Sequence, residues 1–118
     1  MAKKSDKQAV IVDPTTLEAH TPEELLARGW LFLTRKEYSK GEADLRSALD
    51  SQPDNYEILY ALALLLASDN RPQEALQAFE RALKAVAAME NVVRAHMLSR
   101  LINGHINRIK TGDWNLSR

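Results

Sequence analysis

The chain has few residues of the types that carry out catalysis or bind metals. Its three histidines are His20, His96 and His105, and the last two are nine residues apart. At about 100° per residue, this spacing places them on opposite sides of a helix, so they cannot share a metal ion without another element. There is no cysteine to act as a nucleophile, a zinc ligand or half of a disulfide. These residues therefore predict no metal site.

The sequence also shows no sign of nucleophilic catalysis or of a phosphate-binding loop. The serines and carboxylates show no nucleophile–base arrangement that a sequence can reveal. The four glycines form no loop of the kind that cradles phosphate. We therefore expect a protein that is not an enzyme and uses no cofactor, with its histidines on or near the surface.

Length and charge narrow the remaining possibilities. The 118 residues suffice for one domain with a modest core, and 16 basic residues balance 16 acidic ones. Basic residues outnumber acidic ones after residue 89, but the arginines there point in different directions around a helix. The longest apolar run, residues 58–67, is too short to cross a bilayer, which takes about twenty residues. We expect a soluble, cytoplasmic protein with no nucleic-acid and no membrane partner.

Apolar residues recur three and four positions apart through most of the chain, which predicts helices rather than strands. Thr21, Pro22 and Glu24 form a helix-start signal: a capping hydroxyl, a proline at the first helical position and the acid of a capping box. Residues 1–20, before this signal, are expected to form an extended or disordered arm. The predicted helices run from 21 to 35 or 36, then over about 39–51, 56–68, 72–87 and 90–110.

Two separate stretches of the chain have matching sizes and polarities. EYSKGEADLRSAL (37–49) is matched by RPQEALQAFERAL (71–83), so that Leu45 recurs as Phe79 and Ala48 as Ala82. This period of about 34 residues, with small and apolar residues at fixed places, resembles the tetratricopeptide repeat. One unit covers residues 22–55 and the other residues 56–89. The matching positions are Leu25, Gly29, Phe32, Leu45, Ala48 and Pro53 in the first unit, and Leu59, Leu62, Ala63, Leu66, Ala75, Phe79 and Ala82 in the second.

Three positions depart from the family's pattern. Arg28 stands where leucine is expected, Gly41 where alanine is expected and Ala87 where proline is expected. The resemblance implies an all-α fold, an α-α superhelix of helix hairpins with about five helices. Residues 21–118 are expected to form a single domain, in which the two repeats are followed by a capping helix at 90–110 and a tail at 111–118.

The resemblance also implies a binding surface, because partners in this family usually bind in the concave groove lined by the first helix of each pair. No lysine, arginine or asparagine is expected there, which argues against capture of a peptide's terminal carboxylate. We expect a non-enzymatic protein–protein interaction module (an adaptor, a scaffold or a chaperone-like protein) that binds a peptide or helix through an apolar and aromatic groove. The expected groove residues are Glu23, Leu26, Trp30, Leu33, Glu57, Tyr60 and Leu64.

Aromatic and aliphatic side chains are costly to leave in water, so something is expected to cover Trp30 and Tyr60. The candidates are the chain's own arm at residues 8–17, the last helix, and another chain.

The last predicted helix has one apolar face made of Ala95, Leu98, Ile102, Ile106 and Ile109. It also carries a second apolar stripe, Val93, Met97 and Leu101, which either completes the core or meets a partner chain. Trp114, in the TGDW stretch that follows, either folds back on this helix or docks on a second molecule. The stripe and Trp114 define the alternative function, a self-associating structural protein whose spare apolar surface forms a homodimer.

Overall fold

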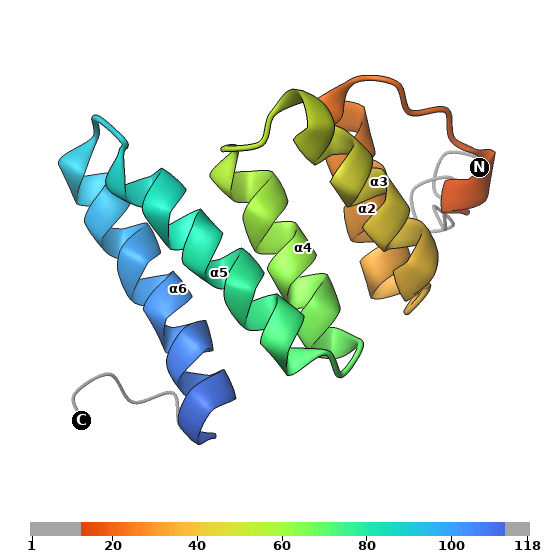
Figure 1. Ribbon diagram of the computed structural model, residues 1–118. Helices are drawn as coiled ribbons and strands as arrows, with labels where there is room; N and C mark the ends of the chain where they lie inside the picture. The colour runs from red at the N-terminus through yellow and green to blue at the C-terminus, as the bar shows by residue number, and fades with distance from the viewer. Residues whose placement is uncertain (1–12, 113–118) are drawn as a thin grey trace, which may run out of the picture.

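The computed structural model describes residues 13–112, which form five α-helices and one short 3-10 helix and contain no β-strand (Figure 1). The elements in chain order are η1 (Pro14–Thr16), α2 (Pro22–Thr34), α3 (Tyr38–Ser51), α4 (Tyr56–Ser68), α5 (Pro72–Ala87) and α6 (Val92–Thr111). The predicted all-α fold is confirmed, and all five predicted helices are present. In this part of the chain, no helix combines the length and the apolar character that crossing a membrane requires.

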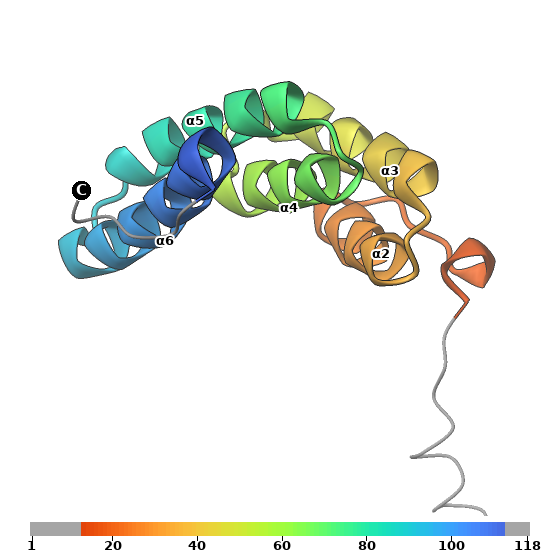
Figure 2. The same ribbon diagram turned by 90° about the horizontal axis from the view of Figure 1, so that it is seen from below.

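The helices form an arc of two layers (Figure 2). Helices α2, α4 and α6 line the inner, concave side, and α3 and α5 form the outer layer. Each helix packs against the next one along the chain, and α2 also contacts α4 directly. Helix α6 therefore occupies the place that the first helix of a third pair would take.

The turn inside each helix pair has the same backbone geometry. Lys36 and Asn70 occupy equivalent positions in the two repeats, and both adopt the left-handed conformation, with φ of 62° and 60°. The amide of Glu37 donates to the carbonyl of Phe32 at 2.9 Å, and the equivalent bond in the second pair is also 2.9 Å long. The period found in the sequence is therefore also a period of the backbone.

Side chains cap the starts of α2 and α6, and the cap of α2 is the capping box that the sequence predicts. The hydroxyl of Thr21 accepts a hydrogen bond from the amide of Glu24 at 3.1 Å, and the Glu24 carboxylate accepts one from the amide of Thr21 at 3.2 Å. At the start of α6, the side chain of Asn91 accepts from the amide of Arg94 at 2.9 Å. These caps satisfy amides that the first turn of a helix leaves without a partner.

Side chains at the positions that match the repeat pattern form the core between the two layers. Phe32 and Phe79 are both buried. Helix α6 joins this core through Ile102 and Ile106, on the apolar face that the sequence predicts. The other buried residues of the pattern are Gly29, Leu45, Ala48, Leu59, Leu62, Ala63, Leu66, Ala75 and Ala82.

Two glycines of the first repeat let its helices approach each other and the second repeat closely. A Cβ on Gly29 of α2 would lie 2.7 Å from Cδ2 of Leu45 in α3. A Cβ on Gly41 of α3 would lie 2.7 Å from Cδ1 of Leu65 in α4 and 3.1 Å from Cβ of Phe32 in α2. Even the methyl group of an alanine would therefore force a buried neighbour to shift, which explains why Gly41 departs from the repeat pattern.

The departure at Arg28 also has a structural partner. The Arg28 guanidinium donates two hydrogen bonds, of 2.7 and 2.8 Å, to the carboxylate of Asp44 in α3, a residue only 7% exposed. It donates a third, of 2.7 Å, to the carbonyl of Leu17. Arg28 therefore links α2, α3 and the segment before α2. Within the described part of the expected arm, residues 13–20, the short helix η1 packs against α2 with Pro14 buried.

A cluster of ion pairs joins the two repeats through the outer layer. Arg71, at the start of α5, contacts Glu42 of α3 at 2.6 Å and Glu74 of α5 at 2.7 Å. Arg46 of α3 pairs with the same Glu42 at 2.8 Å. Hydrogen bonds from Arg71 lower the pKa of both Glu42 and Glu74. Because these groups are partly exposed, dissolved salt screens their attraction.

Replacing Arg28 by leucine, the residue of the repeat pattern, is expected to destabilise the fold by about 2–3 kcal/mol, because the buried carboxylate of Asp44 loses its partner. The double variant Arg28→Leu with Asp44→Ala should recover most of this loss, since no buried charge remains. Urea unfolding followed by circular dichroism measures both. A single variant as stable as the original chain would show that the ion pair contributes no net stability.

Candidate functional site

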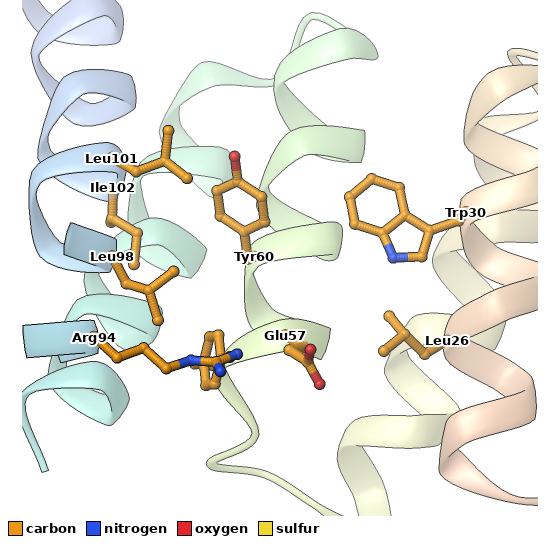
Figure 3. Close-up of a pocket in the computed structure, with 9 residues that line it drawn as sticks. Leu26, Trp30, Glu57, Tyr60, Arg94, Leu98, Leu101 and Ile102 are labelled. Carbon is orange, nitrogen blue, oxygen red and sulfur yellow. The ribbon is translucent and has the colours of Figure 1, made fainter. Parts of the chain in front are cut away.

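The concave side of the arc contains a hollow of about 270 Å³ between α2, α4 and α6 (Figure 3). We call it the inner hollow. Its walls are largely aliphatic and aromatic, with one carboxylate and one guanidinium among them. The lining residues are Leu26, Trp30, Tyr56, Glu57, Tyr60, Arg94, Leu98, Leu101 and Ile102.

The repeat itself places the two sides of the inner hollow. Leu26 of α2 and Tyr60 of α4 are one repeat period apart, so they occupy equivalent positions on neighbouring inner helices. Trp30 lies one turn beyond Leu26, and its indole ring points toward Tyr60 across the gap between α2 and α4 (Figure 3). Both aromatic side chains are half-buried and pack against the core with one part of their surface. Their remaining surface faces the hollow.

The polar groups of the inner hollow lie toward the first turns of α4 and α6. The side chain of Asn55 caps α4 by accepting from the amide of Glu57 at 2.9 Å, and the Glu57 side chain is exposed beside the hollow. Arg94 of α6 donates through Nη2 to the hydroxyl of Tyr56 at 2.8 Å. This bond holds the start of α6 against α4. One end of an otherwise apolar hollow is thus marked by opposite charges (Figure 3).

An aromatic cluster joins α6 to the two helices of the second repeat. The hydroxyl of Tyr60 and Nε2 of His105 are 2.9 Å apart, a hydrogen bond in which either atom can donate. The His105 ring also stacks on Phe79, with centroids 4.9 Å apart and planes 7° apart. Burial raises the pKa of Tyr60 and lowers that of His105, and the nearby charge of Arg108 lowers the latter further. The cluster therefore favours uncharged side chains.

A second hollow, of about 410 Å³, lies farther along α4 and α6 than the Tyr60–His105 pair. Phe79 forms part of its wall, and Leu64 is the one predicted groove residue that lines it. The pair of Tyr60 and His105 thus separates two hollows on the same inner face. The lining residues are Leu64, Ala67, Ser68, Phe79, His105, Arg108 and Ile109.

The structure brings together some of the predicted groove residues and separates others. Leu26, Trp30, Glu57 and Tyr60 line the inner hollow. Leu33 is half-buried against the core and lines neither of the two hollows. The remaining residues are placed as follows: Leu64 lines the second hollow, and Glu23 is exposed on α2 outside both.

The residues of the predicted dimer surface also fall in different places. Val93 and Met97 are exposed on α6, whereas Leu101 is partly exposed and lines the inner hollow. The stripe therefore does not complete the core. Trp114 lies outside the described residues.

Sequence reasoning missed Tyr56, at the start of α4, and three residues of α6. Arg94, Leu98 and Ile102 of α6 line the inner hollow, although the predicted groove contained no residue of this helix. Helices α2, α4 and α6 begin at positions 22, 56 and 92. This near-equal spacing was a signal that α6 is a third inner helix. Of the expected covers over Trp30 and Tyr60, α6 lies beside Tyr60. Residues 8–12 of the arm lie outside the described residues.

The hollow offers surfaces for packing and two charged groups rather than a set of metal ligands. Among residues 13–112, no three side chains of the types His, Asp, Glu and Cys gather closely enough to hold a metal ion. The chemistry available is the burial of an apolar group, with a cation attracted by Glu57 and an anion by Arg94.

The shifted pKa of His105 predicts a pH-dependent stability. Its pKa in the fold lies below the ordinary value of 6.5, so the unfolded chain binds the proton more readily. The contribution of His105 is therefore complete above about pH 6.5 and is lost as the pH falls through its lowered value. The melting temperature of the chain should fall more between about pH 7.5 and pH 5 than that of a His105→Phe variant.

The control for this measurement is His96→Phe, an exposed position on the same helix. It should keep the pH response of the original chain. If His105→Phe shows the same pH response as well, the cluster does not disfavour the protonated ring.

Comparison with protein-family models gives a match to the tetratricopeptide repeat over residues 26–91. The match covers more than half of the chain and includes α3, α4 and α5 completely. Neither the curated proteins nor the solved structures that were compared give a significant match. The family is generally a non-enzymatic interaction repeat. With the repeated backbone turns, the buried pattern residues and this match, the chain belongs to the tetratricopeptide-repeat family.

Proposed function

We propose that the chain is a non-enzymatic protein–protein interaction module, located in the cytoplasm, that binds a peptide or helix on its concave side. The observation that carries this proposal is the inner hollow, which has a volume of about 270 Å³. Its lining includes Leu26, Trp30 and Tyr60 from the two repeats and Leu98 and Leu101 from α6. A partner would insert one apolar or aromatic side chain into this space. The role is that of an adaptor, a scaffold or a chaperone-like protein.

Burial of apolar surface provides the driving force. A leucine- or phenylalanine-sized side chain gains roughly 1.5–3 kcal/mol when it is fully removed from water. Trp30 and Tyr60 already pack against the core on one side, so binding costs little ordering of the protein itself. Aromatic side chains in such surroundings often supply much of the binding energy at an interface.

The charges at the end of the hollow give the bound segment a preferred direction. Glu57 attracts a basic residue, and Arg94 attracts an acidic residue or a carboxylate. The preferred ligand therefore has a basic residue near Glu57 and an acidic one on the side of α6, near Arg94. Exposed charge pairs of this kind contribute more to orientation and to association rate than to affinity.

Self-association is the second candidate, because Val93 and Met97 leave exposed apolar surface at the α6 end of the arc. Light scattering coupled to size-exclusion chromatography separates the two candidates. A dimer whose mass is independent of concentration, and which Met97→Asp converts to a monomer, would favour self-association.

The test of the interaction proposal is the variant Trp30→Ala, measured against peptides selected from a displayed library on the immobilised chain. Loss of the indole should lower the affinity of peptides that bind in the inner hollow about tenfold or more. Circular dichroism checks that the helical content is unchanged. Leu17→Ala, which shortens an exposed apolar side chain before α2, is the matched control and should leave binding intact.

Leu26→Ala gives a second measurement in the same hollow. The proposal fails if the selected peptides bind both hollow variants as tightly as the original chain. A collapse of the helical signal in Trp30→Ala would instead make Trp30 a residue of the core, and Leu26→Ala would then decide whether the hollow binds.

A further inference from the structure

Helix α6 carries exposed apolar side chains on the side that faces away from the core. Val93, Met97 and Leu101 follow one another at four-residue intervals, and they are 70%, 65% and 40% exposed. We call these three residues the α6 stripe. Apolar side chains gathered on an exposed face are characteristic of surfaces that bind another molecule.

The α6 stripe is continuous with the inner hollow. Leu101 belongs to both. A further hollow, of about 600 Å³, lies beside Val93 and Met97, and Arg94 and Leu98 line it as well as the inner hollow. Apolar surface therefore extends from the concave side around α6 to its outer side.

Positive charge borders this stripe on both sides. At about 100° per residue, Arg94 and Arg100 each lie about 60° around the helix from Met97, in opposite directions. Arg108 and Lys110 follow near the end of the helix. From Val92 to Thr111 the helix has no aspartate and no glutamate. The exposed stripe thus runs between two arginines with no acidic residue on the same helix.

The arginines of α6 differ from most arginines elsewhere in the fold. Arg28, Arg35, Arg46 and Arg71 each pair with a carboxylate of this chain. Among the ion pairs of residues 13–112, none includes an arginine of α6. Positive charge on α6 is therefore left for a partner of opposite charge to neutralise.

This combination favours one kind of occupant. A second copy docked through α6 would bring the arginines of both copies together, which like-charge repulsion opposes. Nucleic acid calls for a basic patch, whereas these arginines are separated by apolar side chains. Binding at a membrane surface requires a broad apolar face, and the broad apolar face of α6 is buried against the rest of the array through Ile102 and Ile106.

We propose that the α6 stripe docks an amphipathic helix of a partner protein, with apolar side chains that pack on the stripe and acidic side chains on both flanks that pair with Arg94 and Arg100. Side chains of two packed helices interdigitate at an axis separation of about 8–10 Å, and paired carboxylates and guanidiniums fix the register. The centre of the inner hollow, at Trp30 and Tyr60, is a different surface. This proposal therefore goes beyond the proposed function.

The test is a selection on the full chain from a displayed library of helical peptides about 18 residues long, in which alanine-based positions vary among Leu, Glu, Lys and Ala. Synthetic copies of the selected peptides are then measured by fluorescence anisotropy. We expect peptides with glutamates on both flanks of a leucine stripe. Met97→Asp should lower the affinity of these peptides about tenfold or more, and Trp30→Ala should leave their affinity unchanged.

Arg100→Glu tests the charge pairing directly. It should lower the affinity of the glutamate-flanked peptide about three- to tenfold at low salt. It should raise the affinity of the same peptide with lysines in place of the glutamates. Gln77→Asp, an exposed position on α5, is the matched control and should change neither. Since Val93 and Met97 are exposed, Val93→Asp and Met97→Asp should both keep the helical circular dichroism signal.

Four results would overturn the proposal. Binding of the selected peptides could be lost in Trp30→Ala and kept in Met97→Asp, which would place all binding in the inner hollow. Lysine-flanked peptides could bind the original chain as well as glutamate-flanked ones. The chain could form a dimer that Met97→Asp dissociates. Finally, phosphatidylserine vesicles or single-stranded RNA could bind the chain more tightly than any selected peptide and lose that binding in Met97→Asp.

Discussion

The fold depends on a close approach of three helices at Gly41. No side chain separates α3 from Phe32 of α2 and Leu65 of α4 at this point, and Gly29 opens a similar gap toward Leu45. Because the repeats pack on one another through such short contacts, small residues set the spacing of the layers. One consequence is that α2 and α4 meet directly on the inner side. Their aromatic side chains can then line a single hollow instead of two separate surfaces.

The parts of the fold that repeat could be predicted, because a repeated helix pair shows its small and apolar residues twice. The bridge between Arg28 and Asp44 could not, since no periodic rule connects a polar side chain on one helix with one on the next. The short helix η1 was predictable in principle. Its side-chain cap, Asp13, is followed directly by Pro14, a common combination at the start of a helix.

The candidate site was partly predictable for the same reason. Leu26 and Tyr60 occupy equivalent positions in the two repeats, so a groove position identified in one repeat predicts the matching position in the other. The contribution of α6 was harder to predict because this helix begins slightly later than strict repetition would place it and lies beyond the region that matches the family. The contact of His105 with Tyr60 and Phe79 depends on how α6 is rotated about its axis. Burial of Ile102 and Ile106 sets that rotation, and a helical pattern alone does not say which neighbour each side meets.

The cluster around Arg71 has a mechanical consequence for the arc. In the outer layer, α3 and α5 are connected by an ion pair in which Nη1 of Arg71 lies 2.6 Å from Oε1 of Glu42. The core between the two layers is held together by buried apolar side chains. Dissolved ions weaken the first kind of contact and leave the second nearly untouched. The contacts between the two repeats are therefore ionic at the outer surface and apolar in the core. We therefore expect added salt to loosen the outer contact between α3 and α5 before it affects the packing of the core.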